Sequence, residues 1–264
     1  MKNRIYFFTG TGNSLKVAKD IAASIDDCEI VAICKGASVD VPDEIERIGF
    51  VFPVYFFGLP NMVADFLRKI NIKSAKYLFA IATPGGVSGK PLAQAEMILS
   101  KKGVNLNYGK KIRMSANYII RYGPIWIFNK TAMKWYDKRI NSIIHDVKSM
   151  KSNKIEKHSK RIEATYEKYI CNVHDTDKGF HTNADCVACG ICVNVCPAKN
   201  IKLEEGLPVF NHRCESCVAC IQYCPKKAIN YENKTQKRKR YTHPDVKHSE
   251  LSNYYKQSIN KNNV

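Results

Sequence analysis

Two cysteine runs with the same spacing limit the possible structures of this chain more than any other feature. Each run reads C-x2-C-x2-C-x3-C-P, from Cys186 to Pro197 and again from Cys214 to Pro225. Three closely spaced thiolates can bind one iron–sulfur cluster, while the fourth, turned away by the proline-bounded turn, binds the other. The spacing therefore predicts two [4Fe–4S] clusters. The predicted ligands are Cys186, Cys189, Cys192 and Cys224 for one cluster, and Cys214, Cys217, Cys220 and Cys196 for the other.

Structural zinc is the alternative use of such a cysteine-rich segment. Zinc ribbons contain pairs of cysteines separated by a longer loop, whereas each quartet here ends in proline. The spacing thus favours an iron–sulfur site over a zinc site. We interpret the cysteines outside the repeat, Cys28, Cys34 and Cys171, as packing residues or inert surface residues.

Apolar runs in this chain are short. The run after the N-terminus, residues 5–8, is too short for a secretory signal, and no stretch reaches the ~18 apolar residues of a membrane span. We therefore expect a cytoplasmic protein without stable membrane insertion, in which thiols stay reduced and clustered cysteines bind metal.

Residues 174–232, which contain both cysteine runs, resemble bacterial-type two-cluster ferredoxins. The resemblance implies a small α+β domain that transfers single electrons. It also implies that Ala188, Gly190 and Ala219 are the small residues that let backbone amides approach the sulfur atoms.

The N-terminal part alternates short apolar runs with helical patterns, which is typical of βαβ units on a parallel sheet. The predicted strands are residues 5–8, 30–33, 48–54 and 77–82, with a weaker fifth at 111–114. Apolar residues at helical spacing predict helices over 15–25, 61–70 and 91–101. A stripe from Ala132 through Tyr136, Ile140, Ile143 and Val147 to Met150 predicts a last helix that closes the domain.

The loop after the first strand has the composition of an anion site. Glycines permit a tight turn there, and backbone N–H groups at the start of the next helix attract negative charge. The loop lacks the third glycine of a dinucleotide fingerprint and the lysine of a Walker A motif. A nucleotide or a plain tight turn therefore remains an alternative to a flavin phosphate. The residues concerned are Thr9, Gly10, Thr11, Gly12, Asn13 and Ser14.

This loop resembles the FMN phosphate loop of flavodoxins, and residues 1–151 are similar to that family as a fold. The resemblance implies a doubly wound parallel sheet with FMN at the carboxyl ends of its strands. It also implies that the loops after the third and fourth strands contact the flavin ring. These loops contain Pro53, Val54, Tyr55 and Phe56, and Thr83, Pro84, Gly85 and Gly86.

The formal charge of +18 is concentrated in two segments. Residues 101–170 carry 17 basic and 5 acidic side chains, and residues 226–264 carry 10 and 3. We expect the first segment to attract acidic redox proteins. The basic run 237–240 is also compatible with nucleic acid, but charge runs are usually solvated, so we expect no nucleic-acid partner.

The whole chain resembles the single-chain flavodoxin–ferredoxin fusion proteins of anaerobes. The expected domains are residues 1–151 for FMN, a helical linker at 152–173, a ferredoxin domain at 174–232 and a basic, disordered tail at 233–264. The resemblance implies electron transfer between FMN, the clusters and external partners. We find no catalytic constellation in the sequence beyond the cofactors. The alternative is a flavin-dependent reductase that passes electrons to a quinone or another small organic acceptor.

Overall fold

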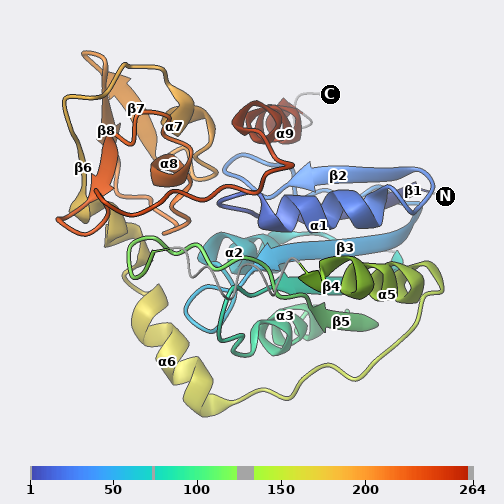
Figure 1. Cartoon of the computed structure of the whole chain (residues 1–264). Helices are drawn as coiled ribbons and strands as arrows, with labels where there is room; N and C mark the ends of the chain where they lie inside the picture. The colour runs from blue at the N-terminus through green and yellow to red at the C-terminus, as the bar shows by residue number, and fades with distance from the viewer. Residues whose placement is uncertain (1, 73–74, 124–133, 261–264) are drawn as a thin grey trace.

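A five-stranded parallel sheet organises the N-terminal part of the computed structural model, which describes residues 2–72, 75–123 and 134–260 (Figure 1). The strand order is β2-β1-β3-β4-β5, the 2-1-3-4-5 order of flavodoxin-like folds. The predicted doubly wound sheet is therefore confirmed. Its strands are β1 (Lys2–Phe7), β2 (Cys28–Ala32), β3 (Ile45–Pro53), β4 (Ala75–Thr83) and β5 (Tyr108–Lys111).

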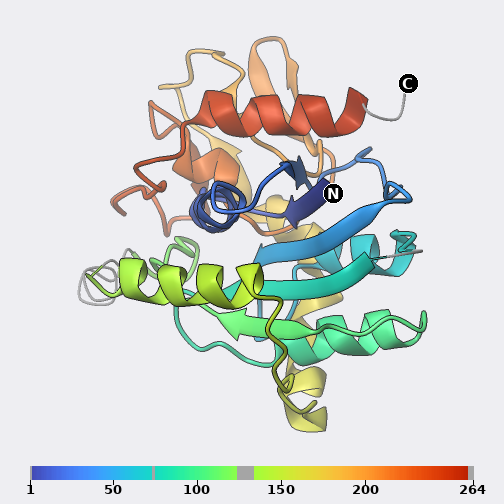
Figure 2. The same ribbon diagram turned by 90° about the vertical axis from the view of Figure 1, so that its right-hand side faces the viewer.

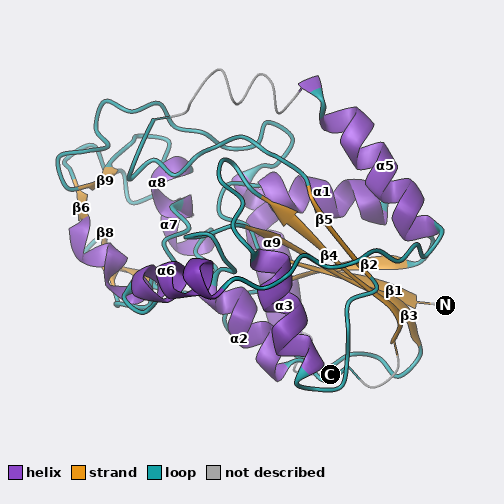
Figure 3. Cartoon of the chain, turned by 90° about the horizontal axis from the view of Figure 1, so that it is seen from below, coloured by secondary structure: helices purple, strands orange, loops and turns teal. Residues whose placement is uncertain are grey.

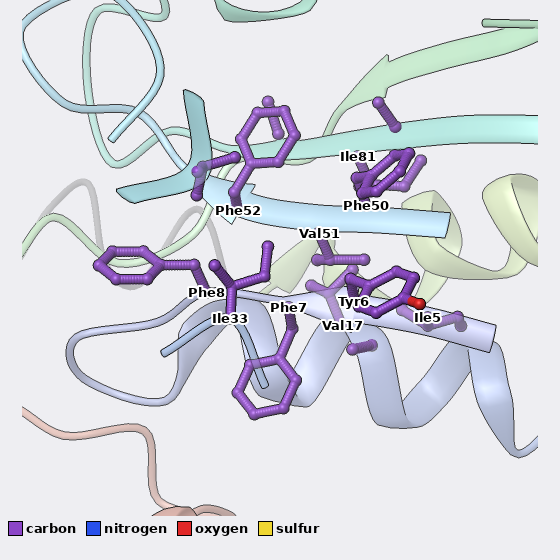
Figure 4. Packing of buried hydrophobic residues seen from close by; sticks show 14 of the residues in the cluster. Ile5, Tyr6, Phe7, Phe8, Val17, Ile33, Phe50, Val51, Phe52 and Ile81 are labelled. Atoms are coloured by element: carbon purple, nitrogen blue, oxygen red, sulfur yellow. The ribbon is translucent and has the colours of Figure 1, made fainter. Parts of the chain in front are cut away.

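The central strands are apolar on both faces because helices cover both sides of the sheet. Successive residues of β1, such as Tyr6 and Phe7, are fully buried although their side chains point to opposite faces (Figure 4). Figure 3 shows α1 and α5 on one side of the strands, with α2 and α3 on the other. These helices are α1 (Asn13–Ala22), α2 (Asn61–Lys69), α3 (Pro91–Ser100) and α5 (Tyr136–Lys148).

The predicted last helix of this domain forms over a shorter range than its apolar stripe. Tyr136, Ile140, Ile143 and Val147 are buried on α5 as expected, whereas Ala132 lies outside the described residues. The fifth strand also lies a few residues earlier than the predicted 111–114. The reason is that Tyr108 and Gly109, rather than the apolar residues that follow them, pair with Phe79 and Ala80 of β4.

The cysteine-rich domain follows the exposed helix α6 (Lys160–Ile170) and the 3-10 helix η1 (Val173–Gly179). Strand β6 (Phe180–Thr182) pairs antiparallel with β9 (Ile229–Tyr231), and β7 (Ile201–Glu204) forms a hairpin with β8 (Leu207–Phe210). The helix α7 (Ile191–Asn194) precedes the hairpin in the chain, and the helix α8 (Ala219–Gln222) follows it. The two short helices contact each other. Each helix carries the third cysteine of one run.

The C-terminal tail differs from its prediction, because residues 248–260 form the helix α9 (His248–Asn260) instead of being disordered. Figures 1 and 2 show α9 beside the edge of the sheet that ends in β2. The side chains that α9 buries include Leu251, Tyr255 and Ser258. This stripe is half polar, so it gives a weak apolar periodicity although it packs well. No helix in the described part of the chain is long and apolar enough to cross a membrane.

Candidate functional site

A cavity of about 330 Å³ opens at the carboxyl ends of β1, β3 and β4. This is where ligands bind in open parallel sheets. The three loops singled out from the sequence come together here. Every residue predicted to contact FMN lines the cavity except Gly12 and Pro84: Thr9, Gly10, Thr11, Asn13, Ser14, Pro53, Val54, Tyr55, Phe56, Thr83, Gly85 and Gly86.

The loop before α1 has the geometry of an anion cradle. Gly12 adopts a left-handed conformation with φ of 96°, and its N–H donates to Thr9 Oγ1 at 3.0 Å. Helix α1 then begins at Asn13 with no side-chain cap and no acidic residue in its first turn. Its first N–H groups have no acceptor within the helix, so they are directed towards any bound anion. Ser14 is fully buried, and its hydroxyl contacts the Thr83 hydroxyl at 2.8 Å.

The loop after β3 closes in a tight turn that presents aromatic rings. Tyr55 and Gly58 exchange two backbone hydrogen bonds of 3.0 and 2.8 Å. The two residues between them, Phe56 and Phe57, have φ values of 48° and 72°, which cost energy for bulky side chains. The Phe56 ring stacks on Tyr169 from α6 at 5.3 Å. The strained turn thus holds an aromatic wall at the cavity.

Two further walls of the cavity lie outside the three predicted loops. One is the segment after β5, which contributes Asn117, Tyr118 and Arg121. Arg121 is the only charged residue in the lining that the structure describes. The tyrosines of this segment were the one available sequence signal. The other wall is residues 216–218 of the cysteine-rich domain, for which the sequence gives no signal.

Each predicted set of cluster ligands surrounds its own small cavity. Cys186, Cys189, Cys192 and Cys224 line one cavity, and Cys196, Cys214, Cys217 and Cys220 line the other. The fourth cysteine of each run therefore faces the opposite set, as the spacing predicts. No described group of three His, Cys, Asp or Glu residues is arranged to hold a single metal ion. A four-iron cluster differs in binding each thiolate through a separate iron atom.

Backbone amides already point at several of these sulfur atoms. The N–H groups of Asn200, Ser216 and Ala228 donate to the sulfurs of Cys196, Cys214 and Cys224 at 3.3, 3.3 and 3.2 Å. Burial raises the thiol pKa of Cys192 to about 11 and that of Cys217 to about 12. Metal ligation requires thiolates, so the loading of iron must displace protons from these buried thiols.

The large cavity at the carboxyl ends of the strands and one cysteine cavity share a wall. Cys217 and Val218 line both cavities. A Cβ on Gly10 would lie 2.2 Å from the Cys217 carbonyl oxygen and 3.2 Å from the Tyr55 hydroxyl. Burial raises the pKa of Tyr55 well above its usual value, with further contributions from Cys217 and Glu215, so this phenol stays protonated. The two domains therefore meet backbone to backbone between the two cavities.

Comparisons with known proteins agree with the cysteine-rich domain. Residues 131–242 match the sequence model of the 4Fe-4S dicluster domain. No curated protein matches the chain.

Three solved structures have weak similarity to the chain. Rubredoxin oxygen:oxidoreductase from Desulfovibrio gigas is 17% identical with a TM-score of 0.31, over 42% of this chain and 30% of that chain. A putative flavoprotein from Bacteroides uniformis is 17% identical with a TM-score of 0.34, over 52% and 97%. Trp repressor binding protein from Bacillus subtilis is 16% identical with a TM-score of 0.37, over 55% and 98%.

The strand order and the dicluster match together describe the chain. Its N-terminal part has the flavodoxin-like 2-1-3-4-5 sheet, and its C-terminal part has an iron–sulfur dicluster domain. The chain thus combines a flavodoxin-like sheet with an iron–sulfur dicluster domain.

Proposed function

We propose that the chain is an electron-transfer protein that binds FMN in the 330 Å³ cavity and two [4Fe–4S] clusters in the two cysteine cavities. A flavin exchanges two electrons and can pass them singly, whereas each cluster carries one. Such a chain connects external donors and acceptors of different electron number. We also propose a cytoplasmic location, because cysteines that bind iron–sulfur clusters must remain reduced.

The residues of the large cavity suit FMN in their chemistry. The N–H groups at the start of α1 and the surrounding hydroxyls suit a phosphate, because they attract negative charge without a cation. Thr11, Asn13 and Ser14 lie at this end. Tyr55 and Phe56 offer apolar faces to a flat ring, while the backbone of Gly85 and Gly86 can approach its polar edge. Tyr55, being protonated, brings no charge to the ring.

The observation that best supports this function is the shared wall at Cys217. A proposed ligand of one cluster stands in the lining of the proposed flavin site, so electrons need not cross solvent between them. The set that contains Cys217 is then the inner one. The other set contains Cys189, which is exposed, and this places its cluster nearer to external partners.

The reductase alternative is favoured by one feature, the guanidinium of Arg121 in the cavity lining, which suits an anionic organic acceptor. The carrier has better support, because the described lining contains no Asp, Glu, His or Lys to transfer protons to such an acceptor. We also propose acidic proteins rather than nucleic acid as partners, because the linker helix α6 carries the exposed basic side chains Arg161 and Lys168.

Anaerobic purification with iron, sulfide and flavin assays tests this function. We expect about eight irons and one FMN per chain. Stepwise reduction followed by visible and EPR spectroscopy should then show reducing equivalents equilibrating between the flavin and the clusters. Iron without flavin would contradict the FMN site.

Two matched ligand variants test the order of the clusters. Cys217→Ser should abolish rapid electron exchange between flavin and iron–sulfur signals. Cys189→Ser should leave that exchange intact and slow the reaction with an external protein donor. Equal effects of the two variants on internal exchange would contradict the inner position of the Cys217 set. Turnover of a quinone at rates above those of protein acceptors would favour the reductase.

A further inference from the structure

Residues 234–247, which lie between β9 and α9, connect the cysteine-rich domain to the edge of the sheet. We call these residues the strap. Figure 1 shows it running from the small domain to α9. It crosses the loop that precedes α1. The N–H of His243 donates to the Thr11 carbonyl at 2.8 Å, and the Tyr241 hydroxyl donates to Asn13 Oδ1 at 2.8 Å. The strap therefore holds two residues of the anion cradle.

Gly12 faces this strap rather than the cavity. A Cβ added to Gly12 would lie 2.8 Å from the Val246 Cβ and 3.1 Å from the His243 Cβ. The absence of a side chain at this position therefore allows the strap to close over the loop. The first residue of the loop is held as well, because Tyr255 of α9 donates its hydroxyl to the Thr9 carbonyl at 3.3 Å.

Gln222 anchors the strap to the cluster-bearing helix α8. This side chain lies between Cys220 and Cys224 and is only 4% exposed. Its Oε1 accepts the N–H of Tyr241 at 2.7 Å, and its Nε2 donates to the Asn117 carbonyl at 2.7 Å. One buried amide thus holds both the strap and the segment after β5.

Two chains of hydrogen bonds, which we call arms, lead from Gln222 to the anion cradle. Through Tyr241 the first arm reaches the side chain of Asn13, whose Nδ2 donates in turn to the Ser115 carbonyl at 3.0 Å. Through Asn117 the second arm reaches the hydroxyl of Thr11, which accepts from Asn117 Nδ2. The cradle therefore depends for its shape on a residue that lies among the cluster ligands.

We propose that Gln222 and Tyr241 are positioning residues that couple the two kinds of cofactor site, so that cluster loading strengthens FMN binding by ordering the phosphate cradle. The inference rests on the proposed function. Coupling between two binding sites is reciprocal, so bound FMN must favour cluster retention by the same factor. The Tyr241 hydroxyl contacts the cradle through Asn13, whereas Gln222 also holds Asn117 in the cavity wall. The loss of the Tyr241 hydroxyl should therefore concern the phosphate of FMN more than its ring.

The test uses the full chain, prepared anaerobically with its clusters and freed of flavin, and titrates it with FMN and with riboflavin by fluorescence. The variants are Gln222→Met, which removes both hydrogen bonds of the amide, and Tyr241→Phe, which removes only the hydroxyl's hydrogen bond to Asn13 Oδ1. The matched controls are Gln257→Met on the exposed face of α9 and Tyr223→Phe, whose buried hydroxyl has no partner among the described residues. Iron and sulfide are assayed in every sample.

We expect the FMN dissociation constant to rise about fivefold in Tyr241→Phe and about tenfold or more in Gln222→Met. In Tyr241→Phe the dissociation constant of riboflavin should change less than about twofold, and the controls should match the wild type. The wild-type chain without clusters should bind FMN at least about fivefold more weakly than the loaded chain.

Three results would overturn the proposal in distinguishable ways. Unchanged FMN affinity in Tyr241→Phe at full iron content would show that the strap does not support the cradle. Equal losses of FMN and riboflavin affinity in Tyr241→Phe would show a general structural role rather than one at the phosphate. A loaded wild type that binds no FMN would remove the proposed function itself. If Gln222→Met loses iron, Tyr241→Phe alone decides, because its residue lies outside the cluster domain's ligand runs.

Discussion

Gly10 and Gly12 belong to one short loop, yet each allows a different distant segment to approach. Gly10 leaves room for the carbonyl of Cys217, and Gly12 leaves room for Val246 of the strap. The sequence predicts both glycines as parts of a phosphate turn, and the structure has a turn at this position, with Gly12 in a left-handed conformation. These additional roles could not be predicted, because no local pattern indicates which distant backbone will contact a loop.

Gly10→Ala tests the contact between the domains. The backbone of Gly10 is not left-handed, so alanine meets no local strain there. Its Cβ would instead collide with the Cys217 carbonyl, which belongs to the backbone and cannot rotate away. We expect the free energy of unfolding to fall by about 1–3 kcal/mol and FMN affinity to fall with it. Denaturant unfolding measures the first and flavin fluorescence the second.

Gly123→Ala is the matched control, because no residue that the structure describes lies within 4 Å of the Cβ that it would add. This variant should retain the stability and the FMN affinity of the wild type. If Gly10→Ala behaved in the same way, the close approach of Gly10 to Cys217 would not describe the protein in solution.

At the scale of elements, strong apolar periodicity was sufficient to predict a strand or helix from the sequence, whereas a buried face that is partly polar was not. The first four strands and α1 to α3 form within a few residues of their predicted bounds, because their buried faces consist of residues such as Phe50, Ile81 and Leu99. Helix α9 was missed because its buried stripe includes Ser258. That hydroxyl accepts the N–H of Ala32 at 2.8 Å on the open edge of β2, a role that apolar patterning does not record.

Ser258→Ala should expose the importance of this edge contact. The substitution leaves the buried N–H of Ala32 without its acceptor, so we expect a loss of about 1–3 kcal/mol in the free energy of unfolding. Hydrogen exchange at the Ala32 amide should also become faster. Ser249→Ala, at an exposed position of the same helix, should change neither measurement. Unchanged exchange at Ala32 would show that α9 does not protect the sheet edge.

The strap should respond to mild acid through His243, which is 2% exposed. Burial lowers the pKa of this imidazole below its ordinary 6.5, while Asp20 and Asp245 act to raise it and Lys16 and Lys19 act to lower it further. When the strap is detached from the loop before α1, the imidazole is no longer buried and takes up a proton more readily. The closed strap is therefore fully favoured above the ordinary pKa, and it loses stability as the pH falls below that value.

FMN titrations between pH 7.5 and 5.5 measure this dependence. The wild type should bind FMN several-fold more weakly at the lower pH. In the closed strap Nδ1 of His243 accepts the N–H of Asp245 at 3.2 Å. His243→Asn keeps an acceptor near this position without a titrating group, and it should retain only the pH dependence that comes from the FMN phosphate itself. Identical pH profiles for the two proteins would exclude the imidazole as the cause.

At the scale of the whole molecule, the sequence predicts both domains but not how they face each other. The cysteine spacing and the loop after β1 each identify a site, and the structure places the first beside the second through Cys217 and Gln222. These contacts join residues far apart in the chain, and a single sequence contains no signal for them. The same holds for charge, because the excess of basic residues in 101–170 acquires a location only once α6 is placed beside Phe56.

This location leads to a prediction about partners. Arg161 and Lys168 are exposed on α6, seven residues apart on the same side of the helix. Tyr169 of the same helix lines the proposed FMN cavity. An acidic redox protein should therefore be attracted to this side, with an association rate that falls as salt screens the charges. The double variant Arg161→Glu and Lys168→Glu should reduce the low-salt rate about tenfold or more and flatten its dependence on salt. Stopped-flow reduction by a small acidic ferredoxin measures both quantities.

The control variant Lys247→Glu and Lys256→Glu changes the net charge equally, at exposed positions on the strap and α9. Equal slowing by the two double variants would mean that net charge, and not the surface of α6, attracts the partner.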